Sequence, residues 1–504
     1  MRQPAGSWSR NLPPALSSPH SANASRGRAT AASTAVVAGT IALVAWGVFA
    51  FGSPYPWAYR PLAIGSALVG LLGLFTGSRP VWASNRVLLM ALAGIAMVTA
   101  VQLVPLPLDW LTRVSPGTVA YLAGYDLRYS VIIDPFGDVT SALRHAVSIA
   151  PARTILFIQL FTAAALLLVG LLRSLSRTTA ARMARGIVVL GFLLALVGIL
   201  QKAILGDDAW GGMRIYGFWE PQFKLTTPFG PFVNKNHFAG WMLMAIPVAL
   251  GLAMGQIDSK ADRFHSDLRS TVVWFSEREG GGMLLYLIAA LVMTISLLMT
   301  GSRSGLGCFA LVMIGAASVT QRTRSKRAVL GFAVAAVVFV ALALVWAGRD
   351  AALHRFTSDR GSVQLRLDVW NASARIVRQF PVLGTGLNTF GTATILYRPP
   401  AVDQHYNEAH NDYLQLLVEG GLITFTLLFI AISSAARAIA ARFRANDDGP
   451  EAQWVRVGAT TGLIAIGLQA LVEFSLQMPG NAVLCVVLLA LALYVPAPFR
   501  PASR

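Results

Sequence analysis

The sequence predicts an all-α polytopic integral membrane protein with about 12 transmembrane helices and a large, partly helical periplasmic loop. Composition is the first reason: of the 504 residues, 55% are hydrophobic and only 13% are charged. The mean hydropathy of +0.59 is far above that of an average soluble domain. The second reason is that nearly uncharged windows of about 20 residues recur along the chain, and each could cross a hydrocarbon core of about 30 Å as a helix.

The windows divide the chain into membrane and loop regions. A basic tail without an apolar core, 1–34, is expected to be disordered and cytoplasmic, with the first span acting as a signal-anchor. Region 35–347 holds nine spans and outer loops at about 105–153 and 206–236. A large outer loop, 348–415, precedes three further spans in 416–497 and a second tail, 498–504. The expected spans are 35–51, 61–76, 87–104, 154–172, 186–205, 237–255, 283–300, 305–320, 328–347, 416–440, 457–474 and 481–497.

Positive residues predict the orientation. With the N-terminus inside, more than half of the 41 Lys and Arg residues fall in inside segments, although these segments are together shorter than the outside ones. Positive charge is retained on the cytoplasmic side, so both termini are placed there. The loop 348–415 opposes this bias with seven arginines, which favours a functional role, although long loops also translocate regardless of charge.

The formal net charge of +18 would suggest a nucleic-acid partner in a soluble protein. In a membrane protein, loop Arg and Lys set the topology and meet anionic lipid, so we expect membrane lipid and no nucleic acid as a partner. Cys308 and Cys485 both fall in apolar spans, which argues against a disulfide or a cysteine metal site.

The segment from Arg366 to Gly421 concentrates polar residues in an otherwise apolar chain. A helix is expected over 359–380, with Arg366 and Trp370 on one face and Arg375 and Arg378 on another. Pro381 should end this helix. The following GTG is no dinucleotide fingerprint, because no strand or βαβ unit precedes it.

After a variable loop, the run AHNDYLQLLVEGG opens the next span and contains His410 and Asn411. A positive helix end favours a neutral imidazole, which can take a proton from a hydroxyl; the alternative is a histidine with only an interfacial role. Glu419 should lie opposite His410 and pack into the bundle. No metal or other cofactor is expected, because the acids and histidines here match no known metal-site spacing.

Two further outer sites carry candidate residues. Asn234, Lys235 and His237 precede or open a span, where they could face an anionic ligand, although Asn at this position also caps a helix. Arg303 lies in the very short GSRSG connection and therefore at the outer interface, where it could hold a partner or reach to lipid headgroups.

Together these motifs are familiar. GSRSG, RxxxW at 366–370, PxxGxGxxxF at 381–390, HNxxLxxxxExG from His410, and NKNHFAG at 234–240 resemble the O-antigen ligase superfamily. This superfamily also contains O-antigen and exopolysaccharide polymerases. The resemblance covers about residues 200–480; the first 150 residues match only in hydropathy.

The resemblance implies a metal-independent glycosyltransferase of lipopolysaccharide biosynthesis, in the bacterial inner membrane with its active site facing the periplasm. The donor would be a glycan on undecaprenyl pyrophosphate and the acceptor a hydroxyl of lipid A-core. By the same resemblance, Arg303 and Arg366 match the arginines expected to hold the pyrophosphate. His410 matches the family histidine at the reaction centre.

Electrostatics agrees with this assignment, because guanidinium groups stabilise the charge that develops on a pyrophosphate leaving group. His410 would activate the acceptor hydroxyl, with inversion at the anomeric carbon, or would only position it. Two alternatives remain. A polymerase of the same superfamily would use a second lipid-linked glycan as acceptor, and a polysaccharide transporter or flippase would have a similar number of spans.

Overall fold

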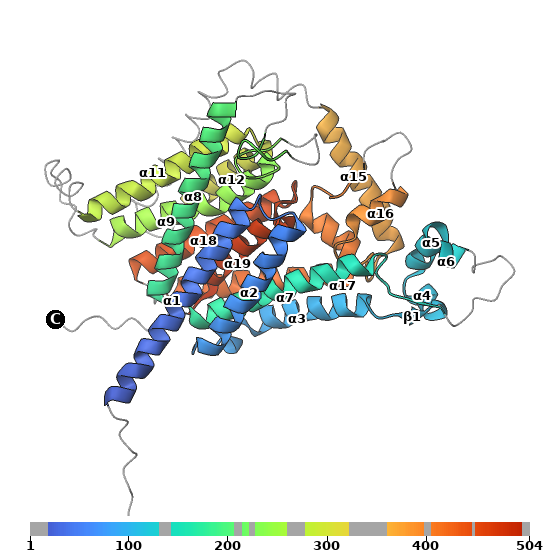
Figure 1. The fold of residues 1–504 in the computed structure, drawn as a ribbon, viewed down its shortest axis with the longest axis horizontal. Coiled ribbons are helices and arrows are strands. Elements are labelled where there is room, and N and C mark those ends of the chain that lie inside the picture. The colour runs from blue at the N-terminus through green and yellow to red at the C-terminus, as the bar shows by residue number, and fades with distance from the viewer. Residues whose placement is uncertain are drawn as a thin grey trace, which may run out of the picture.

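The computed structural model describes residues 19–130, 143–205, 214–220, 227–259, 278–321, 360–397, 405–445 and 449–495. The expected span 328–347 and the tail 498–504 lie outside the described residues. Figure 1 shows a helical bundle in which segments distant in sequence lie together.

Among the described residues, eight helices are long and apolar enough to cross a membrane, which agrees with a multi-pass helical membrane protein. Two of the other expected spans coincide with shorter apolar helices, α12 (Arg303–Gln321) and α19 (Pro479–Leu493), and one with α18 (Pro450–Gln469). The total of twelve spans stays a prediction. The eight are α1 (Pro19–Phe49), α2 (Pro56–Thr76), α3 (Trp82–Gln102), α7 (Pro151–Ser174), α8 (Arg177–Leu205), α9 (Lys235–Asp258), α11 (Arg278–Thr300) and α17 (Asp412–Ala445).

The first helix begins earlier than the sequence suggested. α1 starts at Pro19, inside the range 1–34 that we expected to be a disordered tail, and only its part Ala31–Phe49 qualifies as a span. The segment before Ala31 contains several alanines, which have the highest helix propensity, so the helix extends beyond the apolar residues.

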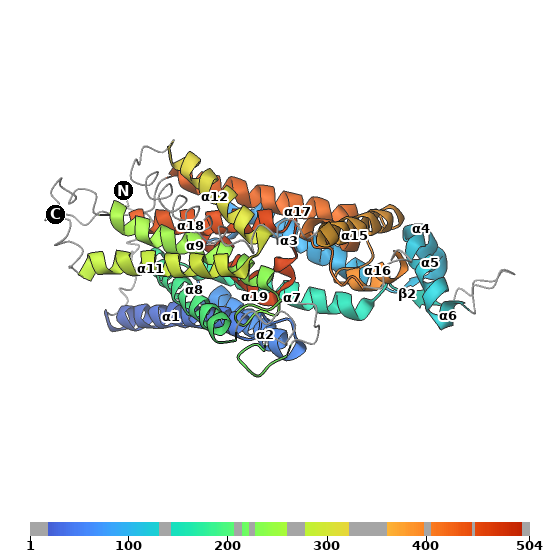
Figure 2. The same cartoon turned by 90° about the horizontal axis from the view of Figure 1, so that it is seen from above.

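Short elements gather at one end of the long helices, seen clearly in Figure 2, and we call this the loop end of the bundle. They are α4 (Leu108–Val114), α5 (Pro116–Tyr125), α6 (Leu127–Ser130), α15 (Arg360–Gln379), α16 (Phe390–Tyr397), and the strands β1 (Leu106–Pro107) and β2 (Arg144–His145). β1 pairs antiparallel with β2, Leu106 opposite His145. The loop 105–153 therefore contains a short antiparallel pair of strands, with helices α4, α5 and α6 between them in the chain.

α9 forms the centre of the bundle, because its apolar window is completely buried. It packs against α18 through glycines that bring the two backbones into contact. A Cβ on Gly251 would lie 2.4 Å from the Trp454 carbonyl oxygen, and one on Gly458 would lie 2.5 Å from the Pro247 carbonyl oxygen. Small residues at helix crossings are typical of membrane bundles, where close packing holds helices together.

The turn after α15 packs on a kink in α17. Gly421 has a φ of 63°, a left-handed conformation that glycine adopts readily, and a Cβ there would lie 2.3 Å from the Val382 carbonyl oxygen. Gly386 N donates to the Glu419 carbonyl at 2.9 Å. The buried Gln102 side chain, at the end of α3, donates to the same carbonyl at 3.0 Å. The PVLGTG turn is thus fixed against the first part of α17.

α2 and α7 provide a test of this glycine packing. A Cβ on Gly170 would lie 2.1 Å from the Gly70 carbonyl oxygen, closer than any real Cβ contact. We expect Gly170→Ala to destabilise the folded protein by about 1–3 kcal/mol, because the backbones must separate. Thermal unfolding of the purified protein in detergent measures this as a lowered Tm.

Gly315→Ala in α12 is the matched control, because nothing lies within 4 Å of a Cβ placed there. Its Tm should equal or exceed that of the wild type, since alanine is the better helix former. Equal Tm values for the two variants would contradict the close α2–α7 contact.

Candidate functional site

A buried carboxylate at the loop end joins three segments that carry separate sequence motifs. Glu473, 1% exposed, lies just after α18. Its Oε1 accepts from Arg366 Nη2 of α15 at 2.5 Å and from Asn236 Nδ2 of α9 at 2.9 Å. Its Oε2 lies 3.4 Å from Nδ1 of His410, which precedes α17. We call Glu473 with Arg366, Asn236 and His410 the Glu473 cluster.

Its contacts with His410 and Arg366 explain how Glu473 can be charged although it is buried. Burial alone would raise the pKa of this carboxyl group, because it disfavours the charged form. The hydrogen bond to His410 and the positive charge of Arg366 outweigh burial, and the pKa is lowered from its ordinary value. Glu473 is therefore ionised at neutral pH and can accept hydrogen bonds only.

Neighbouring backbone and side-chain contacts fix His410. Trp370 Nε1 donates to the Ala409 carbonyl at 3.0 Å, and Ala409 N donates to Gln415 Oε1 at 3.0 Å. Asn411 Oδ1 accepts from Leu414 N at 2.9 Å and so caps the start of α17. His410 itself has a φ of 50°, uncommon for any residue with a side chain, so its surroundings hold it in place.

The carboxylate also determines which nitrogen of His410 is available for chemistry. Because Glu473 can only accept, a bonded Nδ1 must carry the proton, and Nε2 of the neutral ring then keeps its lone pair. The His410 side chain is 35% exposed, so it is open to a ligand. The arrangement suits a general base oriented by an acid.

Phe474 connects a second histidine to the cluster. Its ring packs edge to face against His410, with centroids 4.8 Å apart, and against His237, 4.6 Å apart. His237 is buried, and its Nε2 has no hydrogen-bond partner among the described residues. It is therefore a wall of the site, behind Phe474.

Asn234 and Lys235 begin α9. Asn234 Oδ1 accepts from Asn236 N at 2.9 Å, which is the capping role that the sequence left open. Lys235 N donates to the Thr227 carbonyl at 2.8 Å, which ties the preceding loop to the helix start. Asn236, which is not among the candidate residues predicted from the sequence, is the residue of this motif that reaches Glu473.

Arg303 lies at the start of α12, and its side chain is exposed. A Cβ on Gly305 would lie 2.7 Å from Ala239 Cβ, so the first turns of α12 and α9 are in contact. Arg303 thus stands at the same end of the bundle as the Glu473 cluster, on a neighbouring helix.

Arg375 and Arg378 lie away from the cluster. They are nine and twelve residues beyond Arg366 on α15, which is about 14 Å or more along the helix. Arg375 Nη2 donates to the Tyr397 carbonyl at 2.9 Å, and both side chains are exposed. The structure does not bring these two predicted binding residues to Glu473.

Two other acids of this region have structural partners. Glu419, buried, accepts from Asn388 N at 2.8 Å and from Phe390 N at 2.9 Å, so it caps α16 and packs into the bundle as expected. Glu408 accepts from Gln415 Nε2 at 2.6 Å. Burial raises the pKa of Glu408 to about 7. Among the described residues, no group of three or more His, Cys, Asp and Glu could hold a metal ion.

Part of the chain that carries this geometry matches a known protein family. Residues 288–429 match a family model described as O-antigen ligase. This confirms the resemblance inferred from the motifs and supports a membrane glycosyltransferase of the O-antigen ligase and polymerase type. No curated protein matches the chain.

The O-antigen ligase match contains Arg303, Arg366 and His410 but neither Asn236 nor Glu473. The cluster is therefore completed from outside the matched part of the chain. Glu473 belongs to none of the motifs that indicate site residues in the sequence. The one available signal was an acid near the end of an apolar span, a position where an unpartnered charge is unfavourable.

Glu408 makes stability depend on pH. Between pH 4.5 and about 7 the folded protein keeps a proton on Glu408 that the unfolded chain has lost. Raising the pH through this window should therefore lower the free energy of unfolding. We expect the Tm to fall from pH 5 to pH 7, and to fall less in Glu408→Gln, in which this position cannot ionise.

Glu220→Gln is the control, because Glu220 is exposed and forms its ion pair with the exposed Arg214. It should keep the wild-type slope of Tm against pH. An unchanged slope in Glu408→Gln would contradict the assignment of the proton to Glu408.

Proposed function

We propose that this protein transfers a glycan from undecaprenyl pyrophosphate to an acceptor hydroxyl at the periplasmic face of the bacterial inner membrane, with lipid A-core as acceptor. The observation that carries the proposal is the Glu473 cluster. One buried carboxylate holds a cation and a histidine side by side, both partly open to a ligand. These are the two groups that glycosyl transfer from a pyrophosphate requires.

Arg366 would bind the pyrophosphate leaving group. Only Nη2 is engaged by Glu473, and the side chain is 34% exposed, so further N–H donors of the guanidinium can reach a ligand. Negative charge grows on the pyrophosphate as the glycosidic bond breaks. Fixed guanidinium donors therefore stabilise the transition state more than the ground state.

His410 would act on the acceptor. Nε2 takes the proton of the acceptor hydroxyl while the oxygen attacks the anomeric carbon and the bond to the pyrophosphate breaks. Single displacement inverts that carbon, and the imidazolium formed at His410 is stabilised by the Glu473 carboxylate. No step requires a metal.

Helix ends add positive potential to the same region. α9, α12 and α17 all begin near the cluster, and each N-terminus carries partial positive charge. Lys235 and Arg303 stand in the first positions of α9 and α12. This field favours the dianionic donor. A polymerase would use the same donor chemistry with a second lipid-linked glycan as acceptor.

Transfer in vitro tests the roles. With purified protein, undecaprenyl-pyrophosphate glycan and lipid A-core, we expect transfer that EDTA does not inhibit. His410→Ala should lower kcat about 10²–10⁴-fold by removing the base, and Arg366→Ala about 10²–10³-fold by removing a leaving-group donor. Glu473→Gln, which keeps the shape but loses the charge, should lower it about 10–100-fold.

Arg113→Ala is the matched control, an exposed arginine on α4 at the same end of the bundle; it should retain wild-type kcat. Elongation of the lipid-linked glycan without transfer to core would identify a polymerase. No reaction of folded protein with any glycan donor would overturn the proposal and favour a transporter.

A further inference from the structure

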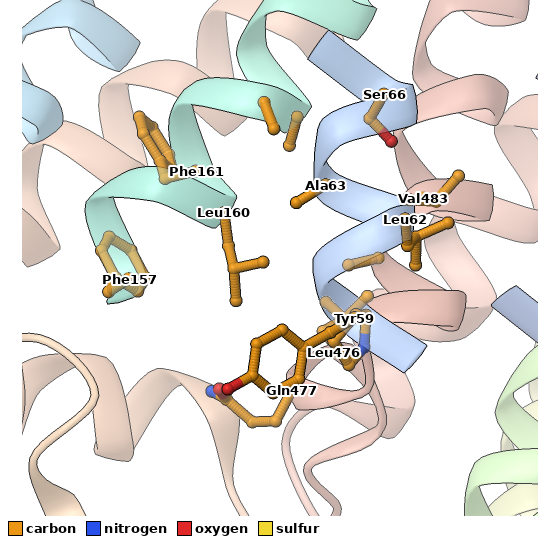
Figure 3. Close-up of a pocket in the computed structure, with 14 residues that line it drawn as sticks. Tyr59, Leu62, Ala63, Ser66, Phe157, Leu160, Phe161, Leu476, Gln477 and Val483 are labelled. Carbon is orange, nitrogen blue, oxygen red and sulfur yellow. The ribbon is translucent and has the colours of Figure 1, made fainter. Parts of the chain in front are cut away.

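A cavity of about 200 Å³ lies between helices beside the Glu473 cluster. It is formed by the N-terminal halves of α2 and α7, the start of α19, and the 3₁₀ helix η2 (Ser475–Gln477). Figure 3 shows Ala63 of α2 and Leu160 of α7 facing each other across it, with Tyr59 and Gln477 at one end. The lining is largely apolar: Tyr59, Leu62, Ala63, Ser66, Phe157, Leu160, Phe161, Ala163, Ala164, Leu476, Gln477, Pro479, Ala482 and Val483.

The cavity adjoins a close contact between α2 and α7. Their backbones touch at Gly70 and Gly170, where no side chain separates them. Toward the N-termini, residues of the stretches 59–66 of α2 and 157–164 of α7 line the cavity. The cavity therefore lies on the N-terminal side of the glycine contact.

The cavity is suited to a hydrocarbon chain. α2 and α7 are both candidate membrane spans, so the part of the cavity between them lies among helices suited to the hydrocarbon core of a bilayer. Phe157 and Phe161 stack with centroids 5.6 Å apart and form one apolar wall. Pockets for whole small ligands typically exceed about 300 Å³, so this cavity would hold only a segment of a longer chain.

One short segment connects the cavity to the Glu473 cluster. Gln477 lines the cavity and its Nε2 donates to Asp412 Oδ1 at 3.2 Å, two residues after His410. Phe474, in the same segment, packs against His410. A chain lying in the cavity would therefore end beside the groups that bind the pyrophosphate.

We propose that this cavity binds the isoprenoid segment next to the pyrophosphate of the donor. The proposal rests on the proposed function for the identity of the donor. We choose the isoprenoid chain over other lipid chains because it is attached to the pyrophosphate that Arg366 would bind at the adjoining site. Binding the chain and the pyrophosphate together would position the anomeric carbon near His410.

Photolabelling tests the site without requiring transfer. The full chain in phospholipid vesicles is irradiated with a polyprenyl pyrophosphate carrying a diazirine on its first isoprene units, and labelled peptides are identified by mass spectrometry. We expect labelling within 59–66 and 157–164. Excess undecaprenyl pyrophosphate should reduce it at least about tenfold, whereas the same excess of phosphatidylglycerol should not.

Ala63→Phe should fill part of the cavity and displace the isoprenoid chain from it. Displacing the equivalent of two methylene groups would lower the affinity for the chain about tenfold. The neighbouring Ile64→Phe is its control, because Ile64 is 62% exposed and does not line the cavity. We expect Ala63→Phe to lose the labelling and to have a higher KM than the wild type for the undecaprenyl-linked donor. Ile64→Phe should keep both the labelling and the wild-type KM.

Labelling elsewhere, equal competition by phosphatidylglycerol, or equal behaviour of the two variants would overturn the assignment and leave the cavity to an acyl lipid. Specific labelling of a protein that transfers no glycan would support prenyl binding while rejecting the proposed function. Glycan transfer by Ala63→Phe with the wild-type KM for the donor would support the proposed function and reject prenyl binding in the cavity.

Discussion

A charge buried in protein must find its hydrogen bonds within the protein, and Glu473 finds them in three segments. Arg366 comes from α15, Asn236 from α9, and His410 from the segment before α17. Removing any of these partners leaves the carboxylate less satisfied in a place that water does not reach. The requirement to satisfy one anion thus sets the relative positions of the helix that holds the cation and the turn that holds the histidine.

Backbone contacts keep these segments in register. Glycines let α9 and α18 touch, and they let the PVLGTG turn rest on the kink of α17. Bulkier residues would separate these backbones, and the distances within the Glu473 cluster depend on that closeness. These glycines therefore act through packing, whereas Arg366 and His410 carry the chemical roles in the proposed function.

The segment from Glu473 to Gln477 has two neighbours of different chemistry. Its acidic end contacts Arg366 and His410, and its other end lines an apolar cavity between α2 and α7. A lipid-linked substrate has the same division, with a charged pyrophosphate joined to a hydrocarbon chain. Recognition of both parts by one short segment would couple membrane attachment of the donor to its orientation at His410.

The sequence by itself determined the membrane class, most of the helices, the extent of α15, and the motifs that carry Arg303, Arg366 and His410. These follow from local properties: apolar length, helical periodicity, and polar residues in an apolar chain. Tertiary structure alone decided that Asn236 and Glu473 join Arg366 and His410 in one cluster and that Arg375 and Arg378 lie away from it. Glu473 is 107 residues beyond Arg366 and 237 beyond Asn236. No local pattern encodes a contact over such separations, because it arises only when the helices pack.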